Sequence, residues 1–131
     1  MYSTLRYEPQ SQSVQLDKDL VAASATPLVL AILNDEESYG YAILKRIREL
    51  SDGEIEWTDG MLYPLLHRLQ RLGYLTTDWR KSAEGRRRKY YSITDEGRAA
   101  LADQRRQWAA VTSALDDLWQ RLELRPSPGG A

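Results

Sequence analysis

The sequence predicts a mostly helical α+β fold, and two adjoining patterns carry the prediction. Leucines between residues 60 and 73 recur at intervals of three and four, which lays a single apolar stripe along a helix. Two short alternating segments follow at 75–79 and 90–93, and residues 82–85 between them favour a turn. A packed helix that leads directly into a hairpin is the outline of a winged helix-turn-helix.

The bulk composition limits the classes of protein to consider. A chain of 131 residues that is 42% hydrophobic fits one compact domain with tails. The net charge of -1 argues against a globally basic nucleic-acid binder, so any affinity for DNA has to come from a local patch. Residues 80–89 supply one, since six cations stand there against one glutamate. There is no cysteine, which excludes disulfides and thiolate metal sites.

The sequence predicts neither a membrane span nor a signal peptide. No apolar run approaches the roughly 20 residues of a membrane helix, and the polar start lacks an apolar core. A cytoplasmic location is therefore expected. Residues 1–16 are interpreted as a mobile N-terminal arm, with packing of Tyr2, Leu5 and Tyr7 on the body or on a partner subunit as the alternative.

The first two helices have recognisable start signals. Residues 17–33 follow a helical pattern that Pro27 interrupts, so either Thr26 caps a helix that begins at Pro27 or a longer, kinked helix runs through. Ser38 is predicted to cap a second helix over 39–50, in which Ile43, Ile47 and Leu50 share one face.

The third helix is bounded by a cap and a glycine. Residues 58–60 offer the cap, and Pro64 favours a start close to Gly60 because a proline is tolerated only near a helix N-terminus. Gly73 is expected to end the helix. The core stripe consists of Leu62, Leu65, Leu66, Leu69 and Leu72.

A long final helix is predicted from Asp95 to Leu122, started by Thr94 and the acids that follow it. From Trp108 onward its apolar residues alternate in steps of three and four, a seam that predicts pairing with another helix and hence a homodimer. We expect a winged-helix domain over 17–94, a dimerisation helix over 95–123 and a disordered tail over 124–131. The predicted dimer interface is Trp108, Val111, Leu115, Leu118 and Leu122.

The side of the third helix opposite the leucines has the chemistry for DNA. It carries Tyr63, His67 and Arg71, and four consecutive cations, Arg86, Arg87, Arg88 and Lys89, follow at the predicted wing tip. Such a helix can enter a groove while the wing holds phosphates. The alternatives to DNA binding are a solvated hairpin with no ligand and an exposed histidine without a partner.

Catalysis and metal binding find little support. A lone histidine makes a poor metal site and leaves no base for a serine nucleophile, and no paired carboxylates stand on a catalytic frame. We therefore expect no enzyme, no metal and no cofactor.

Five motifs in order resemble the PadR family of bacterial transcriptional regulators over residues 27 to 110. They are Ser-Tyr-Gly-Tyr-Ala-Ile at 38–43, Gly-Met-Leu-Tyr-Pro-Leu-Leu-His-Arg-Leu at 60–69, Gly-Tyr-Leu at 73–75, Gly-Arg-Arg-Arg-Lys-Tyr-Tyr at 85–91 and Ile-Thr-Asp-Glu-Gly at 93–97. Met61 departs from the pattern, because the family often has a small hydroxyl residue there. A contact to DNA through that hydroxyl is not expected in this chain.

The resemblance implies a dimeric repressor that binds a roughly palindromic double-stranded DNA operator. It places Tyr41 and Tyr63 near the DNA face, with a packing role as the alternative for both. It also implies an effector site at Trp108, since some members bind planar aromatic compounds there between the subunits. The rival hypotheses are a winged-helix protein-interaction module that does not bind DNA, a ligand sensor with DNA binding as its output, and, more remotely, a hydrolytic enzyme.

Overall fold

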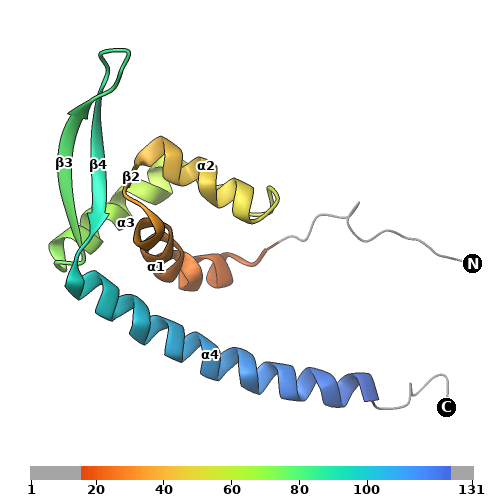
Figure 1. Cartoon of the computed structure of the whole chain (residues 1–131). Coiled ribbons are helices and arrows are strands. Elements are labelled where there is room, and N and C mark those ends of the chain that lie inside the picture. Colours follow the sequence, from red (N-terminus) through yellow and green to blue (C-terminus); the bar gives the residue numbers. More distant parts are fainter. Residues whose placement is uncertain (1–15, 125–131) are drawn as a thin grey trace, which may run out of the picture.

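A computed structural model describes residues 16–124, and its elements form a helical body, a projecting hairpin and a long terminal helix (Figure 1). The elements in chain order are α1 (Lys18–Asp35), β2 (Ser38–Tyr39), α2 (Gly40–Leu50), α3 (Asp59–Arg71), β3 (Leu75–Lys81), β4 (Arg87–Ile93) and α4 (Asp95–Leu124). The three strands form one antiparallel sheet in the order β2-β4-β3. The winged helix-turn-helix predicted from the sequence is therefore the observed fold.

Helix α1 runs through its proline. Asp17 caps the helix, because its side chain accepts a hydrogen bond from the backbone N–H of Asp19 at 3.3 Å. Pro27 lies inside the helix, so the continuous helix was the right alternative and a cap at Thr26 was wrong. The residues that follow the proline, on the inner side of the helix, are buried.

The region of Ser38 differs from the sequence prediction. Ser38 and Tyr39 form the short strand β2, paired with Tyr91 and Tyr90, and α2 begins only at Gly40. Ser38 therefore does not cap α2, since the ladder with β4 holds it in an extended conformation. The residue at the cap position is Tyr39, whose side chain makes no capping hydrogen bond.

Helix α3 begins at Asp59, so that Pro64 is its sixth residue and lies beyond the first four positions that best tolerate proline. Its end matches the prediction. Gly73 has a φ of 84°, in the left-handed region that favours glycine. Its N–H donates to the carbonyl of Gln70 at 3.0 Å and that of Tyr74 to the carbonyl of Leu69 at 2.9 Å, which is the Schellman arrangement.

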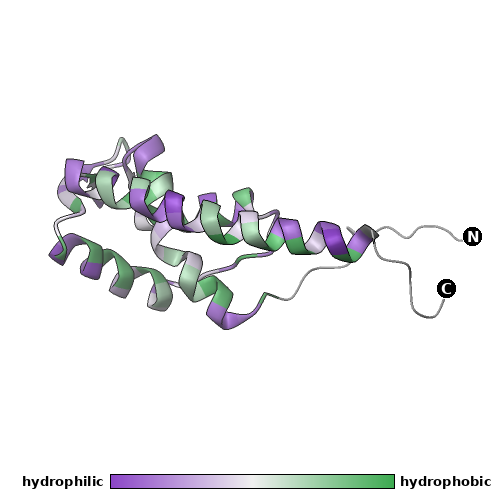
Figure 2. Ribbon diagram, turned by 90° about the horizontal axis from the view of Figure 1, so that it is seen from below, coloured by the Kyte–Doolittle hydropathy of each residue, from purple (hydrophilic) through white to green (hydrophobic). Residues whose placement is uncertain are grey.

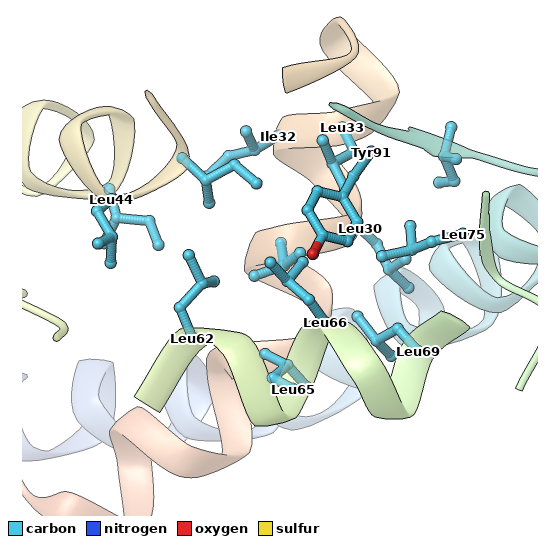
Figure 3. Packing of buried hydrophobic residues seen from close by; sticks show 14 of the residues in the cluster. Leu30, Ile32, Leu33, Leu44, Leu62, Leu65, Leu66, Leu69, Leu75 and Tyr91 are labelled. Carbon is cyan, nitrogen blue, oxygen red and sulfur yellow. The ribbon is translucent and has the colours of Figure 1, made fainter. Parts of the chain in front are cut away.

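The core lies between α1, α2, α3 and the sheet, with the ring of Tyr91 pointing in among leucines of α1 and α3 (Figure 3). Tyr91 is buried and Tyr90 only half-buried, as strand alternation predicts. Leu50 and Leu72 are exposed, which corrects their expected place in the core. Each lies three residues beyond the last buried residue of its helix face, where the helix has passed the core. The other four leucines of the α3 stripe are buried.

The wing is longer than the alternating segments suggested. Strands β3 and β4 remain paired as far as Lys81 and Arg87, beyond the reach of the core. Hydrophobic alternation stops where both faces of the hairpin meet solvent, although backbone pairing continues. The turn is closed by a hydrogen bond from the N–H of Ser82 to the carbonyl of Arg86 at 2.7 Å, with Gly85 at a φ of 84°.

Helix α4 starts as predicted and continues well past the body. The hydroxyl of Thr94 accepts from the N–H of Gly97 at 3.0 Å and donates to the carbonyl of Gly73 at 2.6 Å, which ties the helix start to the end of α3. Gly97 is tightly enclosed, because a Cβ there would lie 2.3 Å from the carbonyl oxygen of Tyr74. From this anchor α4 extends away from the other helices (Figure 1).

The predicted arm and tail lie almost entirely outside the described residues, which begin at residue 16 and end at residue 124. Within that range no helix is both long and apolar enough to cross a bilayer.

Candidate nucleic-acid interface

A hollow of about 550 Å³ opens between the wing, the start of α2 and the outward side of α3. We call it the wing hollow. It is lined by Tyr39, Gly40, Tyr41, Tyr63, His67, Trp79, Arg86, Arg87, Arg88, Lys89 and Tyr91. Four cations and five aromatic rings thus line the hollow, and no carboxylate is among the described residues of its lining. It is a positively charged, partly aromatic surface.

Aromatic rings hold three of the four cations in place. The guanidinium of Arg87 lies 4.9 Å from the ring centre of Trp79, and that of Arg88 lies 4.4 Å from Tyr39. The ammonium of Lys89 is 5.6 Å from the ring of Tyr91. Cation–π contacts at exposed sites contribute about 0.5–1 kcal/mol each, and they leave N–H donors free for a ligand. The wing therefore presents partly pre-ordered cations.

The remaining wing arginine, Arg80, is engaged elsewhere. It forms an ion pair with Glu37 and a second with Asp78 at 3.0 Å, and its guanidinium lies 4.6 Å from the ring of Tyr90. The hydroxyl of Ser92 donates to Glu37 at 3.3 Å. The hydrogen bond from Arg80 keeps the pKa of Glu37 below its ordinary value. Arg80 thus braces the wing against the loop before β2 and is not free to hold phosphates.

One carboxylate remains at the wing tip. The pKa of Glu84 is lowered by its own backbone N–H, then by the hydroxyl of Ser82 and the charges of Arg88 and Arg86. Glu84 therefore stays ionised and offsets part of the positive potential at the tip.

Tyr63 of α3 lies directly on the start of α2. A Cβ added to Gly40 would lie 2.1 Å from the Tyr63 hydroxyl, so only glycine allows this approach. The Tyr63 side chain is 37% exposed and borders the wing hollow. The start of α2 also borders this surface. No side chain caps it, so its first backbone N–H groups lack a capping acceptor.

The structure brings together seven of the eight residues that were predicted to bind DNA. Tyr41, which is 66% exposed, Tyr63 and His67 line the wing hollow with the four wing-tip cations. Arg71 does not, and borders a second hollow between α1 and α3. The reason is helical geometry: at 3.6 residues per turn, every fourth residue drifts by about 40°, so Arg71 has rotated away from Tyr63. Contact of any of these residues with DNA remains a prediction.

Trp79 is the main lining residue that the sequence analysis missed. It is 55% exposed, pairs across the ladder with Lys89 and lines the wing hollow together with the wing cations and His67. Alternation from Leu75 places Trp79 on the inward face of β3, which suggests core. The sequence does not show that the strand has already left the core at this point.

The predicted dimer seam is a row of uncovered apolar side chains. Val111, Leu115, Leu118 and Leu122 are exposed along α4, and Trp108 is half-buried. Figure 2 shows hydrophobic residues along this helix as far as its C-terminal end. Trp119, which was not predicted, is also exposed on this part of the helix.

The described residues offer no cluster of metal ligands. Across residues 16–124, no group of three or more His, Cys, Asp or Glu side chains is placed to hold an ion.

Comparisons with known proteins agree on one family. Residues 29–103 match the family model described as "Transcriptional regulator PadR-like family". A PadR-like transcriptional regulator from Bacillus cereus has a crystal structure that superposes with a TM-score of 0.70 at 28% identity, over 79% of this chain and 98% of the other. A PadR family regulator from Eggerthella lenta gives 0.66 at 34% identity, over 82% and 88%. The Escherichia coli transcriptional regulator YqjI is 28% identical over a region that covers 77% of this chain and 47% of that relative's length.

Proposed function

Because the chain belongs to the PadR-like family of transcriptional regulators, which are DNA-binding proteins and not enzymes, we propose that it acts as a homodimeric repressor that binds a roughly palindromic operator. The observation that carries the proposal is the wing hollow. There the outward face of α3, the uncapped start of α2 and four wing cations form one surface.

Each part of this surface has a separate task in the proposal. Helix α3 enters the major groove, where Tyr63 and His67 face base edges. The wing cations hold phosphates or lie along the adjacent minor groove, and Tyr41 at the start of α2 contacts the backbone. Two such units related by a two-fold axis would read half-sites about one helical turn apart.

The first test separates base reading from phosphate binding on α3. Tyr63→Ala and His67→Ala should weaken binding to the operator far more than to random DNA, since a good base contact contributes roughly 1–3 kcal/mol of discrimination. Arg71→Ala is the matched control, because it lies on the same helix outside the wing hollow. Binding to both DNAs is measured at one salt concentration. Equal losses for all three variants would mean that sequence is read elsewhere, for example through DNA shape.

The second test concerns the wing. Replacing Arg86, Arg87 and Arg88 together with Gln should weaken binding to the operator and to random DNA alike. It should also reduce the slope of log affinity against log salt concentration, by up to the amount expected for the loss of about three phosphate contacts. Arg80→Gln, which removes a wing cation already paired with Glu37, should leave the slope nearly unchanged. An unaltered slope in the triple variant would contradict phosphate binding by the wing.

An effector site at Trp108 is a second proposal. Trp108 is half-buried on α4, at the start of the seam that pairs two subunits in the proposed dimer. A planar aromatic compound between two such rings would bury both faces. The test is to titrate the dimer with planar aromatic compounds. Calorimetry measures their binding, and a DNA-binding assay measures the release of the operator. A Trp108→Ala variant that binds the same compound equally well would rule out this location.

The rival hypothesis of a protein-interaction module without DNA binding explains less. A protein-binding surface gains from apolar anchors at its centre. The wing hollow does contain aromatic rings, but its four adjacent cations, with no carboxylate among its described lining, are the composition that suits phosphate.

A further inference from the structure

Trp79 lies on β3 in the part of the hairpin that projects beyond the helices (Figure 1). It is 55% exposed and does not belong to the core cluster of buried residues. A single exposed aromatic side chain is common on protein surfaces and needs no special explanation. Trp79 differs from such a residue in the charges that surround it.

The strand register gathers three cations around the Trp79 ring. Lys89 pairs directly with Trp79 across the ladder, and Arg87 pairs with Lys81 two residues further along. Directly opposite residues and alternate residues of a strand share one face of a sheet, so all four side chains lie on the same face. Tyr91 of β4 is on this face too and is buried. The three cations therefore lie on the side of the wing that is turned toward the helical body.

Of the wing arginines, Arg87 has the least compensated charge. Arg80 is ion-paired with two carboxylates. The charges of Arg86 and Arg88 act on Glu84, whose pKa they help to lower. Arg87 is exposed, and within residues 16–124 it forms no ion pair. Its positive charge is thus fully available to a bound anion.

The ring of Trp79 is the contact that holds the Arg87 side chain in place. The guanidinium lies 4.9 Å from the ring centre. Lys81 stands directly opposite Arg87 in the ladder, and like charges in that position repel each other. The electron-rich face of the indole attracts the guanidinium and offsets this repulsion. The N–H donors of Arg87 stay free, because a cation–π contact uses none of them.

We propose that Trp79 is a positioning residue, whose ring holds the Arg87 guanidinium where it contacts a phosphate of the DNA that α3 enters. This inference rests on the proposed DNA binding, and it names the side chain that prepares the phosphate contact. Trp79 and Arg87 line the wing hollow together with Tyr63 and His67 of α3. An arginine that is already held by a ring loses less rotamer freedom when it binds, so the contact becomes stronger.

The hairpin also contains a matched aromatic residue with no such role. Tyr90 lies on the opposite face of the sheet, and the guanidinium of Arg80 is 4.6 Å from its ring. Because Arg80 is already ion-paired, loss of the Tyr90 ring should not alter a phosphate contact. Tyr90 is not among the described residues that line the wing hollow. The same substitution at Tyr90 is therefore the control for Trp79.

The test uses a random-sequence DNA duplex of about 24 base pairs, because a phosphate contact does not depend on sequence. Affinity is measured at several salt concentrations. Trp79→Leu should lower the affinity about two- to fivefold per wing, the size expected for an exposed cation–π contact. Trp79→Phe should lose less, since phenylalanine still offers a ring, although a weaker one. Tyr90→Leu should bind like the unmodified chain.

A double-variant cycle with Arg87→Gln assigns the effect to the guanidinium. Arg87→Gln should reduce the slope of log affinity against log salt concentration by about 0.9, the amount for one phosphate. In that background Trp79→Leu should cost nothing further, because no guanidinium is left to position. Thermal unfolding is measured for every variant. If Trp79→Leu does not fold, the same cycle is run with Trp79→Phe.

Three results would overturn the positioning role. They are an unchanged affinity in Trp79→Leu, a loss that persists undiminished in the Arg87→Gln background, and an equal loss in Tyr90→Leu, which would mean that the whole hairpin is disturbed. Each of them can occur while the unmodified protein still binds DNA in a salt-dependent way, so the proposed function would stand. Binding of the unmodified protein that does not depend on salt would contradict phosphate binding by the wing, and with it both proposals.

Discussion

At the scale of single residues, one close contact with a glycine fixes how α3 lies against α2. The Tyr63 hydroxyl occupies the space where a side chain at residue 40 would stand, so α2 and α3 meet through one tyrosine and one glycine. Because Tyr63 also borders the wing hollow, this packing contact fixes the position of a proposed DNA-contacting ring.

We expect Gly40→Ala to reduce operator affinity by about tenfold, or about 1.4 kcal/mol, with only a small change in thermal stability. The new methyl group would displace the far end of a flexible side chain instead of backbone, so the fold should tolerate it while Tyr63 moves. The measurement is operator binding by fluorescence anisotropy together with thermal unfolding.

A double-variant cycle decides whether Tyr63 is the cause. Added to Tyr63→Ala, the Gly40→Ala change should cost nothing further, because the clash has been removed. Gly60→Ala serves as the stability control, since the nearest atom to a Cβ at residue 60 is 3.7 Å away. Additive losses in the cycle would show that Gly40 acts independently of Tyr63.

The individual site residues were predictable where helical periodicity applies and not where it ends. The spacing of the leucines was sufficient to place Tyr63 and His67 outward, and both line the wing hollow. Arg71 was assigned to the same face as Tyr63. It lies eight residues further along α3, where a drift of about 40° per four residues has turned it toward the hollow between α1 and α3. Trp79 was missed because its exposure depends on how far the hairpin projects, which is a tertiary property.

At the scale of elements, the wing depends on support from a strand of two residues. Strand β2 joins the sheet beside β4, and the ion pair of Glu37 with Arg80 connects the loop before it to β3. No sequence pattern could have revealed β2, since two residues have no periodicity and Ser38 also fits a helix cap. The helices were predictable because their patterns extend over several turns, and the hairpin because two short alternating segments flank a turn.

The ion pair predicts a specific pH dependence. The pKa of Glu37 is lower in the folded chain than its ordinary value of 4.5, so the pair stabilises the fold above that value. The contribution disappears as the pH falls through the lower, folded pKa. Glu37→Gln should therefore lower the urea midpoint slightly at pH 7, and by less at pH 3. The effect should be small, because both partners are exposed.

Two further variants identify the source of that dependence. Glu36→Gln changes the neighbouring exposed carboxylate and should shift the midpoint equally little at both pH values. Arg80→Gln should raise the pKa of Glu37 toward 4.5, which an NMR titration of its carboxyl would show. A Glu37 pKa that does not respond to Arg80→Gln would assign its low value to another group.

At the scale of the whole molecule, opposite charges are separated along the chain. The net charge is -1, yet residues 80–89 carry six cations against one acid. A molecule of this kind has little long-range attraction for DNA, so in the proposed dimer the affinity would depend on bringing two wings to the same site. This dependence is a prediction from residue composition and from the spacing of the seam. The hollow between α1 and α3 was not predictable, because it arises only when α1, α3 and the loop between α2 and α3 are assembled.

The last prediction concerns the dimer. Leu115→Asp with Leu118→Asp should give monomers, since each change places a carboxylate in the apolar seam of α4. Loss of the second wing should reduce operator affinity by about 10²- to 10⁴-fold, because binding of the second half-site would no longer be intramolecular. Ala109→Asp with Gln120→Asp is the matched control: it adds the same charges to exposed positions on the opposite side of α4, and it should remain dimeric. Sedimentation and operator binding are measured for both. If the unmodified protein sediments as a monomer at micromolar concentration, the apolar stripe of α4 has another purpose, and each wing must bind DNA alone.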